Sequence, residues 1–173
     1  NRVWDITEAE GRLFLGTDAG IYIKGKKEQV WRHVEGETGR ESVYRLLDTP
    51  QGVLAMTGSK LFLLPRGQKR FAPVFSAGSF ESSLETSEDT DQGEESSGFE
   101  RMLKDVVFRS GVLYLGTTKG LFKSRDAGQR WENIPAEGVQ LFDLTSLAVL
   151  PLVSGKEVFC AGTLKGVYCF LDN

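Results

Sequence analysis

Histidine and cysteine are scarce in this 173-residue chain, which has one histidine and two cysteines. His33 has no cysteine or carboxylate cluster at ligand spacing near it, which argues against a zinc site. A Ser-His-Asp mechanism needs a histidine base, and we expect His33 in an outer strand, far from any central site. Phosphate-binding and dinucleotide-binding fingerprints are also absent. We therefore expect no metal and no cofactor, and we favour a non-catalytic chain.

Long apolar runs and an excess of basic charge are missing as well. The best apolar run, "LTSLAVLPLV" at 144–153, is short and interrupted by Pro151, so no membrane span is expected. The net charge of -3 argues against nucleic acid as a partner. Residues 76–100 hold eight of the 24 acidic residues and none of the 21 basic ones. We predict a disordered acidic insertion loop there, and the docking of a basic partner on it is the alternative.

The chain repeats itself after one hundred residues. The stretch "LFLGTDAGIYIKGKKEQVW" from Leu13 corresponds to "LYLGTTKGLFKSRDAGQRW" from Leu113, and weaker copies begin at Val53 and Val158. Every copy has a threonine four residues before an apolar position; these threonines are Thr17, Thr57, Thr117 and Thr163. A period of about 40 residues, lengthened to about 60 by the acidic segment, is typical of a propeller blade.

Within each of the first three copies, four short apolar runs alternate with Gly, Asp and Lys turns, and no helical periodicity is sustained. The pattern predicts an all-β fold, a β-propeller of four-stranded antiparallel blades at about 1–40, 41–75, 101–138 and 139–173. Because the central runs are apolar at consecutive positions, we expect both faces of each blade to be covered. Gly20, Gly120 and Gly166 are expected to adopt positive φ at hairpin turns.

The fourth copy lacks its outer strand, because the chain stops at Asn173 after three runs. An incomplete blade has an open edge, so we expect another segment or chain to supply the missing strand. The chain also starts at Asn1 without an initiator methionine, as a processed product or an excised part would. We therefore favour a segment of a longer propeller, with a self-contained four-bladed ring as the alternative.

The third copy continues as "SRDAGQRW", which places Ser124, Asp126, Gly128 and Trp131 in the pattern Ser-x-Asp-x-Gly-x-x-Trp. This pattern resembles the Asp box, or bacterial neuraminidase repeat, of sialidases and sortilin-type receptors. The residues fit a structural role, because Asp126 can accept backbone N–H groups, Gly128 permits a reversal and Trp131 can anchor the turn between sheets.

The first two copies depart from this box. The corresponding positions hold Lys24, Lys26 and Glu28 in the first copy and Leu64, Arg66 and Gln68 in the second, and only the aromatic residues Trp31 and Phe71 are kept. The phrases "GRLFLGTDAGIYI" and "GVLYLGTTKGLFK" equally resemble propeller repeats in the sensor regions of bacterial two-component regulators. The resemblance therefore implies a fold and leaves the chemistry open.

Charged residues at or just before the first strand of each blade are candidates for a ligand site in the central channel. These residues are Arg2, Asp5, Arg45, Arg101 and Asp105. Ordinary solvated strand ends are the alternative. A sialidase-like enzyme would need an arginine cluster, a tyrosine nucleophile with a glutamate partner and an acid-base aspartate, and its Arg-Ile-Pro signature is absent.

Cys160 and Cys169 are expected to lie directly opposite each other, because a hairpin turn through "TLKG" pairs Gly162 with Val167. We expect two buried free thiols that act as small hydrophobic side chains, and an oxidising compartment would instead favour a disulfide. We predict a non-catalytic scaffold or recognition module of a larger, extracytoplasmic protein, which binds a protein or glycan through its loops and channel mouth. The alternatives are a fragment of a sialidase-like glycoside hydrolase and the sensor propeller of a bacterial signalling receptor.

Overall fold

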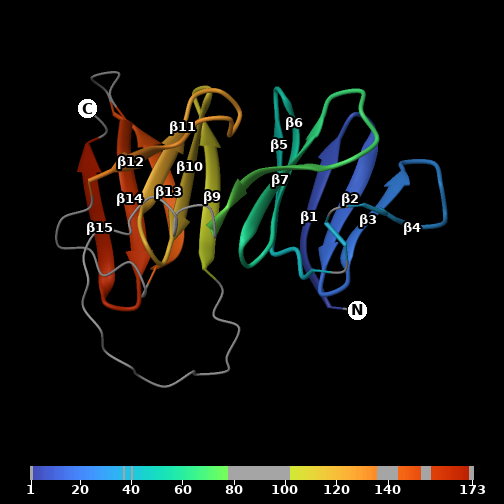
Figure 1. Ribbon diagram of the computed structural model, residues 1–173, viewed down its shortest axis with the longest axis horizontal. Coiled ribbons are helices and arrows are strands. Elements are labelled where there is room, and N and C mark those ends of the chain that lie inside the picture. Colours follow the sequence, from blue (N-terminus) through green and yellow to red (C-terminus); the bar gives the residue numbers. More distant parts are fainter. Residues whose placement is uncertain are drawn as a thin grey trace, which may run out of the picture.

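The computed structural model describes residues 2–36, 38–39, 41–77, 102–135, 144–152 and 157–171. These residues form antiparallel β-sheets, and within each sheet hairpin turns join successive strands (Figure 1). None of them forms a helix long and apolar enough to cross a membrane. The predicted acidic loop at 76–100 lies outside the described residues, except that Ser76 ends a strand and Ala77 packs into the core.

Each copy of the repeat forms one sheet, with its strands paired in chain order. The first sheet contains β1 (Val3–Ala9), β2 (Arg12–Thr17), β3 (Gly20–Gly25) and β4 (Arg32–His33). The second contains β5 (Arg45–Thr49), β6 (Gly52–Met56), β7 (Lys60–Pro65) and β8 (Ala72–Ser76). The third contains β9 (Leu103–Arg109), β10 (Val112–Thr117), β11 (Leu121–Ser124) and β12 (Glu132–Ile134). The fourth has three strands, β13 (Leu144–Pro151), β14 (Glu157–Thr163) and β15 (Gly166–Leu171).

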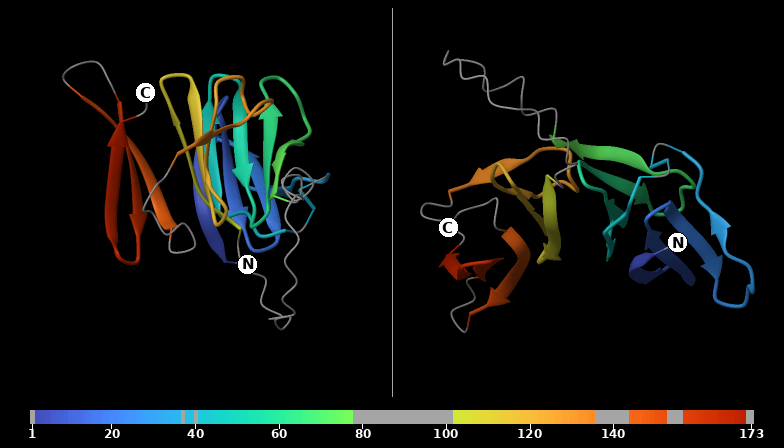
Figure 2. Two further views of the ribbon diagram at one scale, coloured as in Figure 1. Left: turned by 60° about the vertical axis from the view of Figure 1, so that its left-hand side comes forward. Right: turned by 90° about the horizontal axis from the view of Figure 1, so that it is seen from below.

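The four sheets follow one another along an arc, with the first and the fourth sheet at opposite ends (Figure 2). The first strands β1, β5, β9 and β13 contact one another in that order along the inner side of the arc. The fold is therefore all-β and propeller-like, as the repeat period indicates.

Among the described residues, the hydrophobic core consists of three clusters, one between each pair of neighbouring sheets. Phe14 and Ile21 of the first sheet pack against Phe62 and Leu46 of the second, and all four side chains are fully buried or nearly so. The middle sheets contribute to two clusters each. This explains why their strands are apolar at consecutive positions, as expected for strands covered on both faces.

The threonine spacing that recurs in the four copies has a local cause. In each turn between the second and third strand, the threonine hydroxyl donates to the carbonyl oxygen three residues later: Thr17 to Gly20 at 2.9 Å, Thr57 to Lys60 at 3.3 Å, Thr117 to Gly120 at 3.0 Å and Thr163 to Gly166 at 3.1 Å. The side chain thus adds to the backbone pairing that already closes the hairpin, such as the bond from the Thr117 N–H to the Gly120 carbonyl at 2.9 Å.

Glycine was expected to supply positive φ at three of these turns. Gly20 and Gly166 do so, with φ of 94° and 139°, and in this region a Cβ would be strained. The expectation is wrong for Gly120, which is not among the positive-φ residues of the described chain. Its small size serves another purpose, because a Cβ at Gly120 would come within 3.0 Å of the Phe122 ring.

The cysteine register is confirmed, but the thiol state is not. Cys160 in β14 pairs directly with Cys169 in β15, and Gly162 pairs with Val167. The two cysteines form a disulfide, with Cα atoms 4.1 Å apart, so the expectation of free thiols is wrong. The direct cross-strand pairing that the hairpin imposes brings the two Cβ atoms close enough to be bridged.

Candidate functional site

The two aspartates of the predicted channel site, Asp5 and Asp105, join neighbouring sheets. One carboxylate oxygen of Asp5 accepts the backbone N–H of Ile6 at 2.8 Å, and the other accepts that of Leu46 in β5 at 2.8 Å. Asp105 repeats this arrangement with Val106 at 2.9 Å and Leu147 in β13 at 2.9 Å. Each carboxylate therefore bridges its own strand and the first strand of the next sheet.

The arginines of the predicted site differ in position. Arg45 in β5 stands where the first and the third sheet have aspartate, and its Nε lies 3.4 Å from Asp105 Oδ1. Arg2 is exposed, and its guanidinium lies 5.0 Å from the centre of the Trp4 ring. Arg101 lies outside the described residues. The structure thus brings Arg45 and Asp105 together, while Asp5 lies one interface away and Arg2 contacts an aromatic ring instead of a carboxylate.

The Asp-box residues form a closed turn between β11 and β12. Asp126 Oδ1 accepts the hydroxyl of Ser124 at 2.9 Å and the backbone N–H of Arg130 at 2.8 Å. The N–H of Gly128, at φ 91°, donates to Ser124 Oγ at 2.8 Å. Trp131 Nε1 donates to the Gly128 carbonyl at 3.0 Å and to that of Val74 in the second sheet at 3.3 Å. The box therefore fixes its own turn and also ties the third sheet to the second.

The Arg130 N–H is the main cause that lowers the pKa of Asp126, and the Ser124 hydroxyl adds to it. In the first sheet a different residue fixes the equivalent turn. Glu28 accepts the Gly25 N–H at 3.0 Å, and this bond, together with Arg32, lowers the pKa of Glu28. Both carboxylates are thus held in the charged form by the turns that they stabilise.

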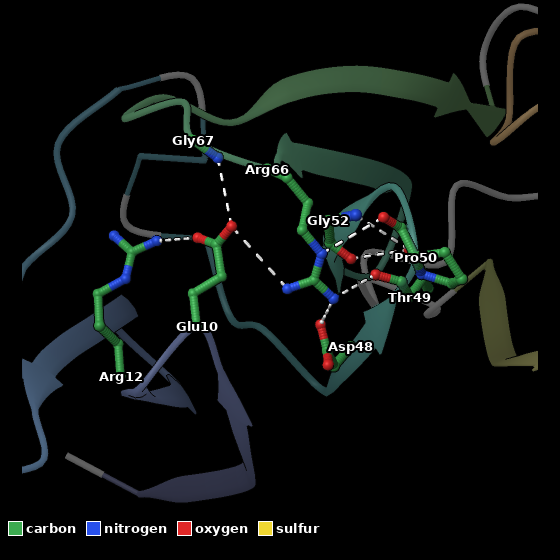
Figure 3. Close-up of polar contacts among 8 residues, drawn as sticks. All are labelled: Glu10, Arg12, Asp48, Thr49, Pro50, Gly52, Arg66 and Gly67. Carbon is green, nitrogen blue, oxygen red and sulfur yellow. Dashed lines mark hydrogen bonds and ion pairs between the residues drawn. The ribbon is translucent and has the colours of Figure 1, made fainter.

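A polar cluster that the sequence did not predict connects the first two sheets. Arg66 Nη2 lies 2.6 Å from Asp48 Oδ1 and donates to the Thr49 carbonyl at 2.7 Å (Figure 3). Glu10 accepts from Arg12 at 2.6 Å and from the Gly67 N–H at 3.3 Å, and its other contact is with Arg66 at 3.9 Å. Arg66 occupies the position of the Asp-box aspartate in the second copy, so the eroded box there has gained a contact with the first sheet.

A groove of about 1070 Å³ lies between the outer parts of the first and second sheets. Its apolar lining includes Ile23 and Val34, which are half-buried, and Leu64 and Phe71, which are buried. The short strand β4 and the residues after it form one wall, and the turn before β8 forms the other. The groove therefore combines an apolar floor with walls from two different repeats.

The walls of the groove carry more positive than negative groups. The cations are Arg12, Arg32, Lys69 and Arg70, and the carboxylates are Glu28 and Glu35. Two of the cations are already paired, Arg12 with Glu10 and Arg32 with Glu28. Lys69 and Arg70 are exposed, and within the described chain neither forms an ion pair. The wall next to β8 thus has two cations available for an anionic ligand.

His33 also lines this groove, and its Nε2 lies 3.0 Å from the Ala19 carbonyl oxygen while its ring contacts Tyr22 edge-on. The sequence carries one signal for the groove: the basic stretches "KGKKEQVWRH" and "RGQKRF" occupy the same turn in the first two copies. Across the ranges that the structure describes, no three His, Cys, Asp or Glu side chains gather in a way that could hold a metal ion.

No model of a known protein family matches the chain, and no curated protein matches it in sequence. Solved structures are similar to it in fold. The computationally designed Ika8 protein matches with a TM-score of 0.60 at 14% identity, over 98% of this chain and 46% of its own. An ancestral GH74 enzyme matches with a TM-score of 0.60 at 18% identity, over 99% and 25%.

The extracellular domain of a B. thetaiotaomicron protein described as a one-component system matches with a TM-score of 0.59 at 9% identity, over 96% and 21%. The chain thus spans less than half the length of each of these structures. Identities this low establish the class of fold alone, a propeller-like arrangement of β-sheets, and they carry no activity over to this chain.

Proposed function

We propose that the chain is a non-catalytic recognition module of a larger protein, and that the groove between its first two sheets binds an acidic segment of a partner protein. The observation that carries the proposal is the pair of exposed cations Lys69 and Arg70 beside a partly exposed apolar floor. Anionic side chains would meet the cations, and an apolar side chain would cover Ile23 and Val34.

A peptide fits the groove better than a glycan does. Sugar rings bind best on an exposed aromatic face, but Phe71, the aromatic residue with its ring in the core beside the groove, is only 4% exposed. The accessible apolar side chains, Ile23 and Val34, are aliphatic and suit the side chains of a peptide.

A glycoside hydrolase in this groove is disfavoured. Such enzymes use a carboxyl group with a raised pKa to protonate the leaving group. Glu28 has its pKa lowered by the Gly25 N–H and by Arg32, the opposite of what a proton donor requires.

An extracytoplasmic location belongs to the proposal. The Cys160–Cys169 disulfide is supporting evidence, because disulfides persist mainly in oxidising compartments. The extracellular placement of one structurally similar domain is consistent with it. These two points support a location at the cell surface or in the periplasm for the recognition role.

The test is the binding of a fluorescein-labelled peptide of glutamate and leucine, followed by anisotropy at low and at physiological salt. We expect saturable binding that weakens as the salt concentration rises. The double variant Lys69→Glu with Arg70→Glu should bind the peptide with an affinity lower by about tenfold. The matched control is Arg125→Glu with Lys119→Glu, which makes the same charge change on the third sheet.

An equal loss of affinity in both double variants would show a general effect of net charge and would contradict a specific groove. Unchanged binding in the Lys69 and Arg70 variant would place the ligand elsewhere. A scrambled peptide with serine in place of leucine tests the apolar floor, and we expect it to bind more weakly.

A further inference from the structure

Among the cations of the groove, Arg12 has a side chain that is already held in place. Its Nη2 donates to Glu10 Oε2 at 2.6 Å, and its guanidinium carbon lies 5.5 Å from the centre of the Phe14 ring. The Arg12 side chain is 32% exposed, whereas Lys69 and Arg70 extend from an exposed turn. Because Arg12 is fixed before a ligand arrives, it loses less conformational entropy on binding than a free side chain does.

The repeat itself does not require an arginine at this position. Arg12 begins β2, and the equivalent residue of the third sheet is Val112, which begins β10 and is buried in the third cluster. Glu10 corresponds to Ser110, and both residues adopt positive φ in the same turn, at 50° and 48°. The same turn therefore forms with and without charged side chains, and the Glu10–Arg12 pair is a feature of the groove.

Glu10 connects Arg12 to the opposite wall of the groove (Figure 3). Its Oε2 accepts from Arg12, and its Oε1 accepts the backbone N–H of Gly67 at 3.3 Å. Gly67 belongs to the turn that also carries Lys69 and Arg70. A single carboxylate therefore sets the position of the held arginine relative to the two exposed cations.

Arg12 keeps donors for a ligand although it is paired with Glu10. A guanidinium has several N–H donors, and the bond to Glu10 uses one of those on Nη2. Within the ranges that the structure describes, Nε and Nη1 of Arg12 have no hydrogen-bond partner. A ligand carboxylate can accept two parallel N–H groups from such a planar fork, a geometry that a lysine cannot offer.

The apolar floor lies at a defined distance from this fork. Arg12 pairs with Gly25, and Ile23 is two residues before Gly25 in β3, so Ile23 is the diagonal neighbour of Arg12 on the same face of the sheet. Diagonal neighbours of an antiparallel pair are separated by about 7–8 Å. In an extended peptide, side chains two positions apart lie on one side and are separated by about 7 Å. The two spacings match.

We propose that Arg12 anchors the ligand by binding a carboxylate of an extended peptide, while an aliphatic side chain two positions along that peptide covers Ile23. The ligand class is then a segment with the pattern acidic-x-aliphatic. Glu10 is a positioning residue, because it acts through Arg12 and through the turn at Gly67. This inference rests on the proposed function of the groove and adds the spacing that the groove selects.

Two fluorescein-labelled peptides of identical composition test the spacing on the 173-residue protein, with anisotropy as the measurement. In one peptide a serine separates a glutamate from a leucine, and in the other the glutamate and the leucine are adjacent. Both have blocked ends, serine at the other positions and a pair of glutamates at the far end for Lys69 and Arg70. We expect the separated peptide to bind about tenfold more tightly, because it alone meets Arg12 and Ile23 at once.

The ratio of the two affinities is the readout, because partial unfolding of a variant would weaken both peptides equally. Arg12→Lys keeps the charge but removes the fork, so it should bind both peptides with equal affinity. Glu10→Gln should reduce the preference for the separated peptide, because Arg12 loses its charged partner. Arg109→Lys is the matched control: Arg109 lies 3.5 Å from Glu157 and outside the groove, and its variant should keep the full preference.

The double variant Lys69→Glu with Arg70→Glu should weaken both peptides by the same factor and keep the preference. Equal binding of the two peptides by wild type, weakened in this double variant, would overturn the inference and leave the proposed function standing. A preference that survives Arg12→Lys would overturn the role of Arg12 as the anchor. Failure of wild type to bind either peptide would contradict the proposed function and this inference together.

Discussion

At the scale of single residues, Asp105 shows how one carboxylate can hold two sheets together. Its two oxygens accept N–H groups from Val106 and Leu147, which are buried at 1% and 7% exposure. A buried N–H without an acceptor is costly, so the main role of the Asp105 carboxylate is to accept hydrogen bonds from these two backbone groups. Asp5 makes the same contacts in a more open setting.

We expect Asp105→Ala to lower the free energy of unfolding by about 3 kcal/mol, because two buried N–H groups lose their acceptor. Asp105→Asn should cost less, since the amide oxygen can still serve one of them. Urea unfolding followed by circular dichroism measures both. Asp18→Ala, which removes an exposed carboxylate, is the control and should have little effect, and an equal effect of all three would contradict the role of Asp105.

The carboxylate of Asp126 should make stability depend on acid. Its pKa lies below the ordinary value of 3.8 in the folded chain, chiefly through the Arg130 N–H. The stabilisation is therefore complete above about pH 5, where both folded and unfolded forms are ionised, and is lost as pH falls through the lower folded value. We expect the difference in urea midpoint between wild type and Asp126→Asn to shrink between about pH 5 and pH 2. A constant difference would exclude this linkage.

At the scale of strands and hairpins, much could be predicted from the sequence. The turns and the consecutive apolar runs define each hairpin locally, which is why the pairing of Cys160 with Cys169 follows from four residues, "TLKG". The disulfide did not follow, because its formation depends on the compartment as well as on geometry. The threonine of each turn was visible as a repeated letter, but its hydrogen bond needs the folded turn.

The disulfide should stabilise the last hairpin. The two cysteines are nine residues apart, and closing a loop of this size stabilises the chain by about 2.5 kcal/mol in the loop-entropy description. We expect dithiothreitol to lower the unfolding midpoint of wild type, measured in urea, and to leave Cys160→Ala with Cys169→Ala unchanged. Free thiols titrated in the non-reduced, unfolded protein would contradict the bridge.

At the scale of the whole molecule, the sequence was least informative where two repeats meet. The role of Asp5 depends on a backbone N–H 41 residues away, and the groove arises from side chains on two different sheets. Neither is encoded in a local pattern. Ile6 and Val167 also look like core positions in the sequence, but their side chains are 56% and 71% exposed in the structure.

The separation of the core into three clusters also determines how the molecule can come apart. Each cluster joins only adjacent sheets, so the chain is a row of units coupled to their nearest neighbours. An end sheet depends on one interface and a middle sheet on two, and opening the first sheet would leave the second and third clusters whole. Cooperativity in this fold is therefore a property of the interfaces between the sheets.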